Sequence, residues 1–281
     1  MRRRGRLRQR RVERMVRRIA AAAEQKMGAN SHEAIVEGQF GPQARSYLMS
    51  AVHAGGEDLE LMARLIGERP DAAAIDVGCG GGHVAFRLAR LVGKVVAYDL
   101  SAAMLAVVAE EARRRGLVNL VTERGAAETL SCPSASFDVA VARYSAHHWR
   151  DLAAGLAQMR RALKPGGLAV FMDAVSPGPP PLDTWLQTLE LLRDPSHVRD
   201  YSLAEWRAAL GAAGFRSKQE AAFRVRLDFA SWIKRMNAPE THAAAIRSLQ
   251  RRADAEASRH FAIEDDGSFT IDSLLIAAEA A

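Results

Sequence analysis

The feature that most constrains the fold of this chain is a run of glycines between a predicted strand and a predicted helix. Residues 73–77 are apolar apart from one acid, as in a buried strand, and a helical pattern follows at 82–92. Gly78, Gly80 and Gly82 lie at alternate positions in the turn between them. Because glycine has no Cβ, the backbone of such a turn can approach a ligand closely, and the first N–H groups of the next helix face the same place. The loop therefore predicts a small-molecule site at the end of a strand.

Strand and helix patterns continue to alternate beyond this loop. Such alternation is typical of a mainly parallel sheet with helices on both faces. We therefore expect a Rossmann-like, doubly wound α/β fold with a mainly parallel seven-stranded sheet, an antiparallel terminal strand and a helical cover. The expected core strands are 73–77, 95–99, 119–123, 137–142 and 168–173, and the expected core helices are 82–92, 102–115 and 150–163.

The segments on either side of this core have mainly helical patterns. The Pro-rich run 176–181 predicts an extended connector, since proline continues neither a strand nor a helix. Alternating residues at 223–227, 269–271 and 274–276 predict a final antiparallel pair, joined by helices over 230–259. The other expected helices are 33–40, 42–52, 58–66, 182–193 and 203–213.

Positive charge is concentrated in the first 26 residues. That segment holds eleven Arg or Lys and two Glu, a net +9, whereas residues 27–281 hold 28 basic and 31 acidic side chains, a net −3. Three hypotheses fit the basic segment: an arm for nucleic acid or anionic membrane, an organellar transit peptide, or an extension upstream of a true start at Met27. We favour the third, so that 1–26 is expected to be a disordered or non-native extension.

Cysteine content and hydropathy indicate which cellular compartment to expect. The chain has two cysteines, Cys79 and Cys132, too few for a disulfide framework and typical of a reducing compartment. It contains no apolar run of 18 residues, so the sequence predicts no membrane-spanning helix. We therefore expect a cytoplasmic protein, whose oligomeric state the sequence leaves open.

The glycine loop differs from the dinucleotide-binding pattern in two ways. His83 stands where that pattern requires its third glycine, and Asp76 lies two residues before the first glycine. Asp-x-Gly-x-Gly-x-Gly after a strand resembles motif I of the class I S-adenosylmethionine-dependent methyltransferases. Residues 136–141 and 163–168 resemble the fourth strand and the turn before the fifth strand of the same family. The closest resemblance is to its ubiquinone/menaquinone-type members.

The resemblance implies S-adenosyl-L-methionine as cofactor and assigns residues to it. The loop passes under the methionine end, Asp76 orients the loop and the ammonium group, and Asp99 holds the ribose diol. A carboxylate suits a diol because it accepts two hydrogen bonds from hydroxyl groups. The other cofactor residues that the resemblance implies, apart from those at the adenine end, are Tyr47, Gly78, Cys79, Gly80, Gly82, Leu100, Met104 and Arg143.

At the expected adenine end the chain differs from this family. Residues 125–128 are Gly-Ala-Ala-Glu, where related enzymes have Gly-Asp-Ala-Glu, so Ala126 cannot accept the bond that the Asp takes from the adenine amine. A hydrogen bond to a charged group is worth about 1.5–3 kcal/mol. The backbone N–H of Ala127 can still reach the adenine ring, and Glu128 is the alternative acceptor for the amine.

Residues 143–149 (Arg-Tyr-Ser-Ala-His-His-Trp) follow the fourth strand, at the sheet edge where open α/β folds bind ligands. Methyl transfer from a sulfonium needs a base only if the acceptor must lose a proton. We expect His148 or His147, and then Tyr144, to supply one. No metal is expected, because adjacent histidines would point apart and a third ligand is missing. His197 belongs to no motif and is expected to be a surface or core residue.

Together these patterns predict a methyltransferase domain over 27–281. It would comprise a helical lid (27–70), a cofactor-binding core (71–175) and a substrate cover with the terminal strands (176–281). We expect it to transfer a methyl group from S-adenosylmethionine to carbon or oxygen of a small molecule. Two alternatives stay open: a non-catalytic cofactor-binding or regulatory protein on the same fold, and an RNA methyltransferase that uses the basic segment. Nucleic acid is disfavoured because 27–281 is acidic and no Asn-Pro-Pro-Tyr-type motif follows the fourth strand.

Overall fold

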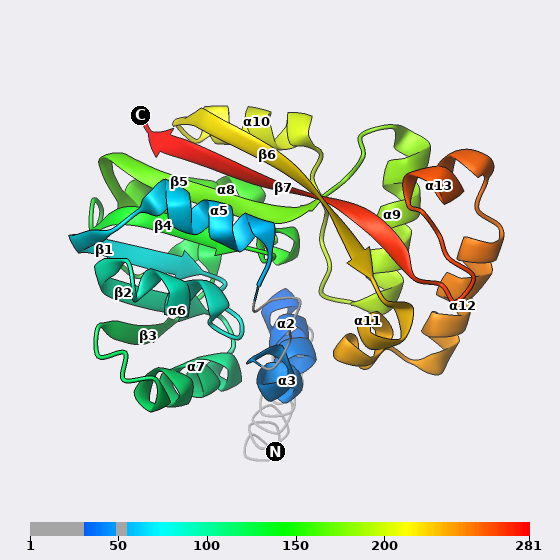
Figure 1. Cartoon of the computed structure of the whole chain (residues 1–281), viewed down its shortest axis with the longest axis horizontal. Coiled ribbons are helices and arrows are strands. Elements are labelled where there is room, and N and C mark those ends of the chain that lie inside the picture. The colour runs from blue at the N-terminus through cyan, green and yellow to red at the C-terminus, as the bar shows by residue number, and fades with distance from the viewer. Residues whose placement is uncertain (1–30, 49–54) are drawn as a thin grey trace, which may run out of the picture.

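A computed structural model of the chain describes residues 31–48 and 55–281. Seven strands form one twisted sheet in the order β3-β2-β1-β4-β5-β7-β6 (Figure 1). The first five strands pair in parallel, whereas β7 runs antiparallel to both β5 and β6. This confirms the expected doubly wound sheet with an antiparallel terminal strand. The strands are β1 (Arg69–Val77), β2 (Val92–Asp99), β3 (Leu120–Arg124), β4 (Phe137–Arg143), β5 (Leu163–Val175), β6 (Phe215–Leu227) and β7 (Phe269–Ala280).

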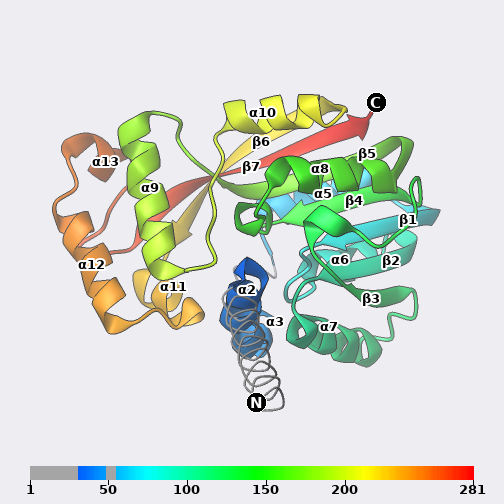
Figure 2. The same cartoon turned by 180° about the vertical axis from the view of Figure 1, so that it is seen from behind.

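Helices cover both faces of the sheet and create two hydrophobic cores. On one face lie α8 (Leu152–Ala162) and α10 (Leu203–Ala212) (Figure 2). Their side chains Leu156 and Trp206 are buried in the core on that face. On the other face lie α5 (Glu57–Ile66), α6 (His83–Leu88) and α7 (Ala102–Arg114). Strands that are covered on both faces read as continuous apolar runs, and Ile75 of β1 is fully buried between Val96 and Ala140 of its two neighbours. The sheet therefore provides a rigid support for the loops at its carboxyl edge.

A second lobe packs around the far ends of β6 and β7. It consists of α9 (Pro180–Arg193), α11 (Phe229–Met236), α12 (Glu240–Arg251) and α13 (Ala255–His260), which lie beyond the main sheet in Figure 1. Its own core is built around Leu186, Trp232, Phe261 and Phe269, all nearly or fully buried. None of the helices in 31–48 and 55–281 is long and apolar enough to cross a membrane.

Two N-terminal helices, α2 (His32–Phe40) and α3 (Ala44–Leu48), joined by the 3₁₀ turn η1 (Gly41–Gln43), lie between the sheet and the second lobe (Figure 1). Ser31 caps α2 by accepting a hydrogen bond from the Ala34 N–H. The Gln39 side chain donates to the Met236 carbonyl at 2.6 Å, and the Tyr47 hydroxyl lies 3.0 Å from the Met236 sulfur. These helices are therefore attached to α11 as well as to the core.

Two sequence expectations need correction. The run 176–181 is only partly an extended connector, because α9 already begins at Pro180; proline is well suited to the first turn of a helix, where its missing N–H has no partner to lose. The helix expected over 82–92 ends at Leu88, and β2 begins at Val92. Part of the helix expected over 42–52 and the whole basic segment lie outside the described residues.

Candidate active site

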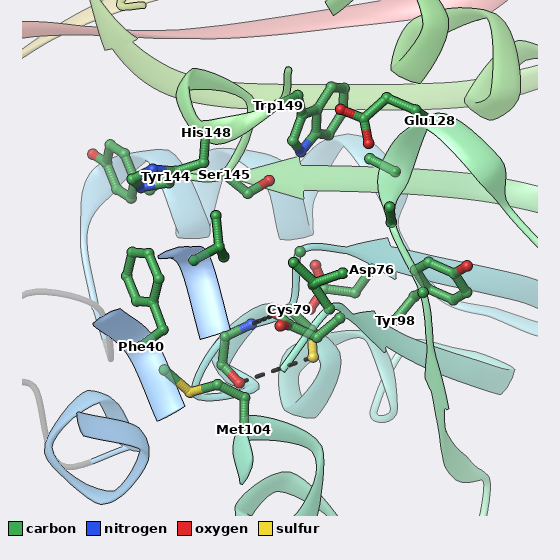
Figure 3. Close-up of a pocket in the computed structure, with 18 of the residues that line it drawn as sticks. Phe40, Asp76, Cys79, Tyr98, Met104, Glu128, Tyr144, Ser145, His148 and Trp149 are labelled. Atoms are coloured by element: carbon green, nitrogen blue, oxygen red, sulfur yellow. Dashed lines mark hydrogen bonds between the residues drawn. The ribbon is translucent and has the colours of Figure 1, made fainter. Parts of the chain in front are cut away.

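A cavity of about 570 Å³ opens at the carboxyl edge of the sheet, where β1, β2 and β4 end (Figure 3). In a parallel α/β sheet this is the edge at which ligands bind. Its walls come from the glycine loop, the loops after β2, β3 and β4, the start of α8, and the N-terminal helices. It is lined by His32, Glu33, Val36, Phe40, Tyr47, Asp76, Gly78, Cys79, Gly80, Gly81, His83, Val84, Tyr98, Asp99, Leu100, Met104, Gly125, Ala126, Ala127, Glu128, Thr129, Arg143, Tyr144, Ser145, His148, Trp149, Arg150, Asp151 and Ala154.

The glycine loop is fixed by hydrogen bonds to the neighbouring strand. The N–H groups of Gly78 and Cys79 donate to the Tyr98 carbonyl at 2.8 and 3.0 Å. Gly78 has φ of +73°, and a Cβ added to it would lie 2.5 Å from the Ser145 side chain. Gly80 has φ of +49°, but a Cβ added there would meet nothing within 4 Å. Gly78 is therefore required by packing, whereas Gly80 keeps space open on the loop's surface.

Gly82 is the loop residue that does not line the cavity. It precedes α6 in a left-handed conformation, with φ of +83°. A Cβ there would come within 2.8 Å of Val108 and 2.9 Å of Phe86. The structure therefore assigns Gly82 to helix packing, while Gly78, Cys79 and Gly80 lie at the cavity surface.

Asp76 is the penultimate residue of β1, beneath the loop, and is almost completely buried. Its Oδ2 accepts a hydrogen bond from the Ala85 N–H at 3.0 Å, which ties the strand to the first turn of α6. Burial, aided by the nearby charge of Asp99, raises the pKa of Asp76 to about 8 despite this bond. A cationic group in the cavity would stabilise the ionised form, since an opposite charge favours it.

Asp99 ends β2 and presents its carboxylate to the same cavity. Its Oδ2 accepts from the Gly80 N–H and its Oδ1 from the Ser101 N–H, both at 2.8 Å. Burial raises the pKa of Asp99, and the two backbone bonds oppose that rise. Each carboxylate oxygen has a further lone pair, so the group is held in place and can still accept hydrogen bonds from a pair of ligand hydroxyls.

The expected adenine end is lined by apolar residues and one acid. Leu100, Met104, Ala126 and Ala127 all line the cavity there, and none of them has a side chain that forms conventional hydrogen bonds. Glu128 lines it too, but its Oε1 already accepts from the N–H groups of Arg150 at 2.8 Å and Asp151 at 3.4 Å. Its first task is therefore to stabilise the start of α8, and only its second oxygen is left for a ligand.

Arg143 and Tyr144, at the end of β4, both line the cavity. The Arg143 guanidinium makes a bidentate, buried ion pair with Asp58 of α5, at 2.6 Å from Nε and 3.0 Å from Nη2. Tyr144 has φ of +49°, an unfavourable conformation for a residue with a Cβ, and its hydroxyl lies 3.2 Å from that of Ser273. Burial raises the pKa of Tyr144, so the phenol stays protonated at neutral pH.

The two histidines after β4 have different positions. His148 lines the cavity, whereas His147 does not. Their rings do not point apart as expected: the centroids are only 4.1 Å from each other, because both side chains leave the tight 3₁₀ turn η3 (Ala146–His148). His147 Nδ1 lies 2.5 Å from Asp173 Oδ1. No group of three or more His, Cys, Asp or Glu with metal-binding geometry occurs in the part of the chain that the structure describes.

His197, which no motif in the sequence singles out, is a buried residue beside this pair. Its ring lies 5.9 Å from that of His147, its Nε2 lies 2.8 Å from Gln187 Oε1, and Asp200 lies 4.0 Å away. No motif in the sequence predicts the contact between the two histidines, because His147 and His197 are about 50 positions apart and come together through the loop after α9.

The N-terminal helices contribute cavity residues that the sequence analysis missed. His32, Glu33, Val36 and Phe40 of α2 line it beside the expected Tyr47. His32 Nε2 donates to the His148 carbonyl at 2.7 Å, and the Phe40 ring meets the His148 ring edge-on at 5.0 Å. The available signal was the aromatic and histidine content of this helix, but its position over the cavity depends on non-local contacts.

The chain is similar to known proteins along most of its length. Residues 75–171 match the family model described as methyltransferase domain. The uncharacterized protein YafE of Escherichia coli is 45% identical over 204 residues, covering 73% of this chain and 99% of that protein. The uncharacterized methyltransferase YcgJ of Bacillus subtilis is 34% identical over 227 residues, covering 81% of this chain and 90% of that protein.

Solved structures agree with these matches. The crystal structure of YcgJ superposes with a TM-score of 0.75 at 31% identity and covers 79% of this chain and 97% of that one. A putative methyltransferase from Bacillus halodurans gives a TM-score of 0.77 at 28% identity, covering 80% and 99%. Both the sequence and the fold are thus shared with relatives over nearly their full length. The chain belongs to the family of S-adenosylmethionine-dependent methyltransferases.

Proposed function

We propose that this protein binds S-adenosyl-L-methionine in the cavity at the carboxyl edge of the sheet and transfers its methyl group to carbon or oxygen of a small molecule. The observation that carries the proposal is the arrangement around the glycine loop. Asp76 and Asp99 are held at the ends of adjacent strands with Gly80 between them, and the space above Gly80 is open.

The residues present fit this cofactor at three points. Asp99 has free acceptor capacity on both oxygens for the ribose hydroxyls. Asp76, whose pKa burial raises, gains an opposite charge when an ammonium group enters. Leu100 and Met104 offer apolar surface for the adenine ring. The fit is weakest at Ala126, which cannot accept a hydrogen bond from the adenine amine; the second oxygen of Glu128 is a candidate acceptor in its place.

When bound, S-adenosylmethionine supplies a methyl group on a positively charged sulfur, and the leaving group departs neutral. The protein's task is then mainly to position the acceptor and to exclude water. Phe40, Tyr144 and Trp149 provide the aromatic surface at the end of the cavity near His148 (Figure 3). His148 is the candidate base for an acceptor that must lose a proton, because it is the histidine of the turn after β4 that lines the cavity.

A small-molecule acceptor is supported by the cavity and by relatives. The N-terminal helices cover the site, with His83 donating to the Tyr47 carbonyl at 3.0 Å. Two relatives that align with 42% of this chain are a 2-phytyl-1,4-naphtoquinone methyltransferase of Synechococcus elongatus and a nocamycin O-methyltransferase of Saccharothrix syringae. None of the cavity residues comes from 176–281, the predicted substrate cover. This segment instead contacts elements that line the cavity, as where the Ser196 carbonyl accepts a hydrogen bond from His148.

Isothermal titration calorimetry of the full chain with S-adenosylmethionine and with S-adenosylhomocysteine tests the cofactor half of this proposal. We expect one site with a dissociation constant well below millimolar for both. Binding only above millimolar would overturn it. Mass spectrometry of small molecules that co-purify with the protein would then identify the acceptor class, and transfer of a labelled methyl group to that molecule would test the reaction.

A further inference from the structure

Behind the wall of the cavity that His148 forms, three buried segments bring histidines and acids together. His147 and His148 come from η3, Asp173 from the end of β5, and Asp194 from the loop after α9. Only His148 reaches the cavity. His147, Asp173 and Asp194 do not line the cavity. Any effect that they have on a reaction there must therefore act through His148.

Asp173 determines the state of His147. Its two oxygens accept hydrogen bonds from the N–H groups of Ala146, His147 and Ala174 at 2.9, 3.3 and 2.9 Å, and from His147 Nδ1 at 2.5 Å. Three backbone donors hold the acid as a carboxylate acceptor, so His147 must carry its proton on Nδ1. Burial acts to lower the pKa of His147, but the charge and hydrogen bond of Asp173 outweigh it and raise the pKa to about 9.

The hydrogen bonds of Ser196 determine the tautomer of His148. The Ser196 hydroxyl lies 2.6 Å from Asp194 Oδ1 and must donate to it, because the carboxylate has no proton to give. It therefore cannot donate to His148 Nδ1. That nitrogen lies 3.1 Å from the Ser196 carbonyl and must be the donor. The remaining ring nitrogen, Nε2, is left with a free lone pair, 3.9 Å from Asp194 Oδ2.

Several charged and titratable groups act on the His148 ring. Burial and the positive charge of His147 lower the pKa of His148 to about 3, whereas the negative charges of Asp194 and Asp173 oppose this. From the N-terminal side, His32 of α2 contacts only the His148 backbone carbonyl. The other titratable groups around the histidine pair come from four places in the fold. They are Asp173 of β5, Glu190 of α9, Asp194, His197 and Asp200 of the loop after α9, and His32 of α2.

We propose that the Asp173–His147 pair is a positioning element that keeps His148 neutral with its proton on Nδ1, so that Nε2 is ready to accept a proton from the methyl acceptor while Asp194 balances the new charge. This inference rests on the proposed function and names the residues behind its base. In the step, the bond from the acceptor's reacting atom to hydrogen breaks and an Nε2–H bond forms. The electron pair left on that atom makes the bond to the methyl carbon, and the pair of the broken carbon–sulfur bond stays on sulfur.

The pair also limits the kind of acceptor. A second proton on adjacent histidines, 4.1 Å apart, is opposed by charge repulsion. His148 is therefore a weak base that is available in nearly every molecule at neutral pH. Such a base suits an acceptor whose reacting atom holds an acidic proton, in contrast to an aliphatic alcohol.

Nuclear magnetic resonance of the full chain labelled with ¹⁵N at histidine tests this inference without any ligand, since ring nitrogen shifts report tautomer and charge. In the wild type we expect His147 to be charged at pH 7 and His148 to be neutral with the proton on Nδ1 down to below pH 5. His148 charged at pH 7, or neutral with the proton on Nε2, would overturn the proposal. This measurement needs no variant and so does not depend on whether a variant folds.

His147→Gln then separates positioning from a merely structural role. Glutamine keeps an N–H donor for Asp173 but removes the charge, so the titration midpoint of His148 should rise by about one to three pH units. His260→Gln is the matched control, because it removes another His–Asp pair, with Asp272 at 2.9 Å, on a distant helix. It should leave His148 unchanged. A His148 midpoint that does not move in His147→Gln would overturn the proposal.

Binding of S-adenosylhomocysteine by the same samples distinguishes this inference from the proposed function. A wild type that binds this compound but has His148 in the other tautomer overturns the inference alone. A wild type that fails to bind it overturns the proposed function first. Adding Asp194→Asn to His147→Gln should lower the His148 midpoint again, and an unchanged midpoint would contradict the role given to Asp194.

Discussion

Replacing Gly80 by alanine tests whether the open space above the glycine loop is a cofactor site. Gly80 has φ of +49° and a Cβ there would meet nothing within 4 Å, so the protein itself has room for the methyl group. The cost to folding is then only that of a left-handed alanine, about 1–2 kcal/mol. For a domain of this size that corresponds to a fall in melting temperature of about 2–8 °C.

Gly116→Ala is the matched control. Gly116 follows α7 with φ of +69°, and a Cβ there also meets nothing within 4 Å, but it does not line the cavity. We expect both variants to lose similar stability in thermal denaturation followed by circular dichroism. Calorimetry should show S-adenosylhomocysteine binding at least about tenfold weaker in Gly80→Ala, equal to 1.4 kcal/mol, and unchanged in Gly116→Ala. Equal affinity in the two variants would refute the role given to the loop.

Three further predictions follow from the site. Asp58→Ala leaves the buried Arg143 guanidinium without its carboxylate and should cost about 3–5 kcal/mol in chemical denaturation, most of it recovered in Asp58→Leu with Arg143→Met; a cost below 1 kcal/mol would contradict this. Asp76 has a folded-state pKa raised to about 8 by burial, so its contribution to stability is present below about pH 4 and is lost as pH rises to about 8. In Asp76→Asn the free energy of unfolding should fall less between about pH 4 and pH 8 than in the wild type. An unchanged pH dependence of unfolding would contradict the raised pKa of Asp76. Ala126→Asp should tighten S-adenosylhomocysteine binding at least tenfold, by about 1.5–3 kcal/mol, and weaker binding would argue against adenine at this end.

The sequence predicted the sheet and the cavity floor well because their signals are local. The glycine loop, Asp76 and Asp99 lie at fixed spacings from the strands that carry them, and the structure brings them to one cavity. The predicted start of α9 is wrong, because proline is compatible with a first helical turn as well as with an extended connector. In both cases the outcome depended on residues close to each other in the chain.

The histidine cluster could not be predicted, because it depends on contacts between distant segments. The adjacency of His147 and His148 predicts rings that point apart, whereas Asp173 holds the His147 ring and the Ser196 carbonyl holds the His148 ring. His197 joins them because its loop is bound to this turn, as by the Val198 N–H, which donates to the His147 carbonyl at 2.8 Å. Such a bond has no signature in periodicity or composition.

Asp99 provides the most direct test of cofactor binding. Calorimetric titration with S-adenosylhomocysteine should compare the wild type, Asp99→Ala, and the control Glu220→Ala, which removes a carboxylate from a surface ion pair with Arg207. Loss of two hydrogen bonds to a charged group, at about 1.5–3 kcal/mol each, predicts an affinity at least about 100-fold lower in Asp99→Ala. Glu220→Ala should bind as the wild type does. If Asp99→Ala also binds as tightly as the wild type, the cavity at the carboxyl edge of the sheet is not the cofactor site.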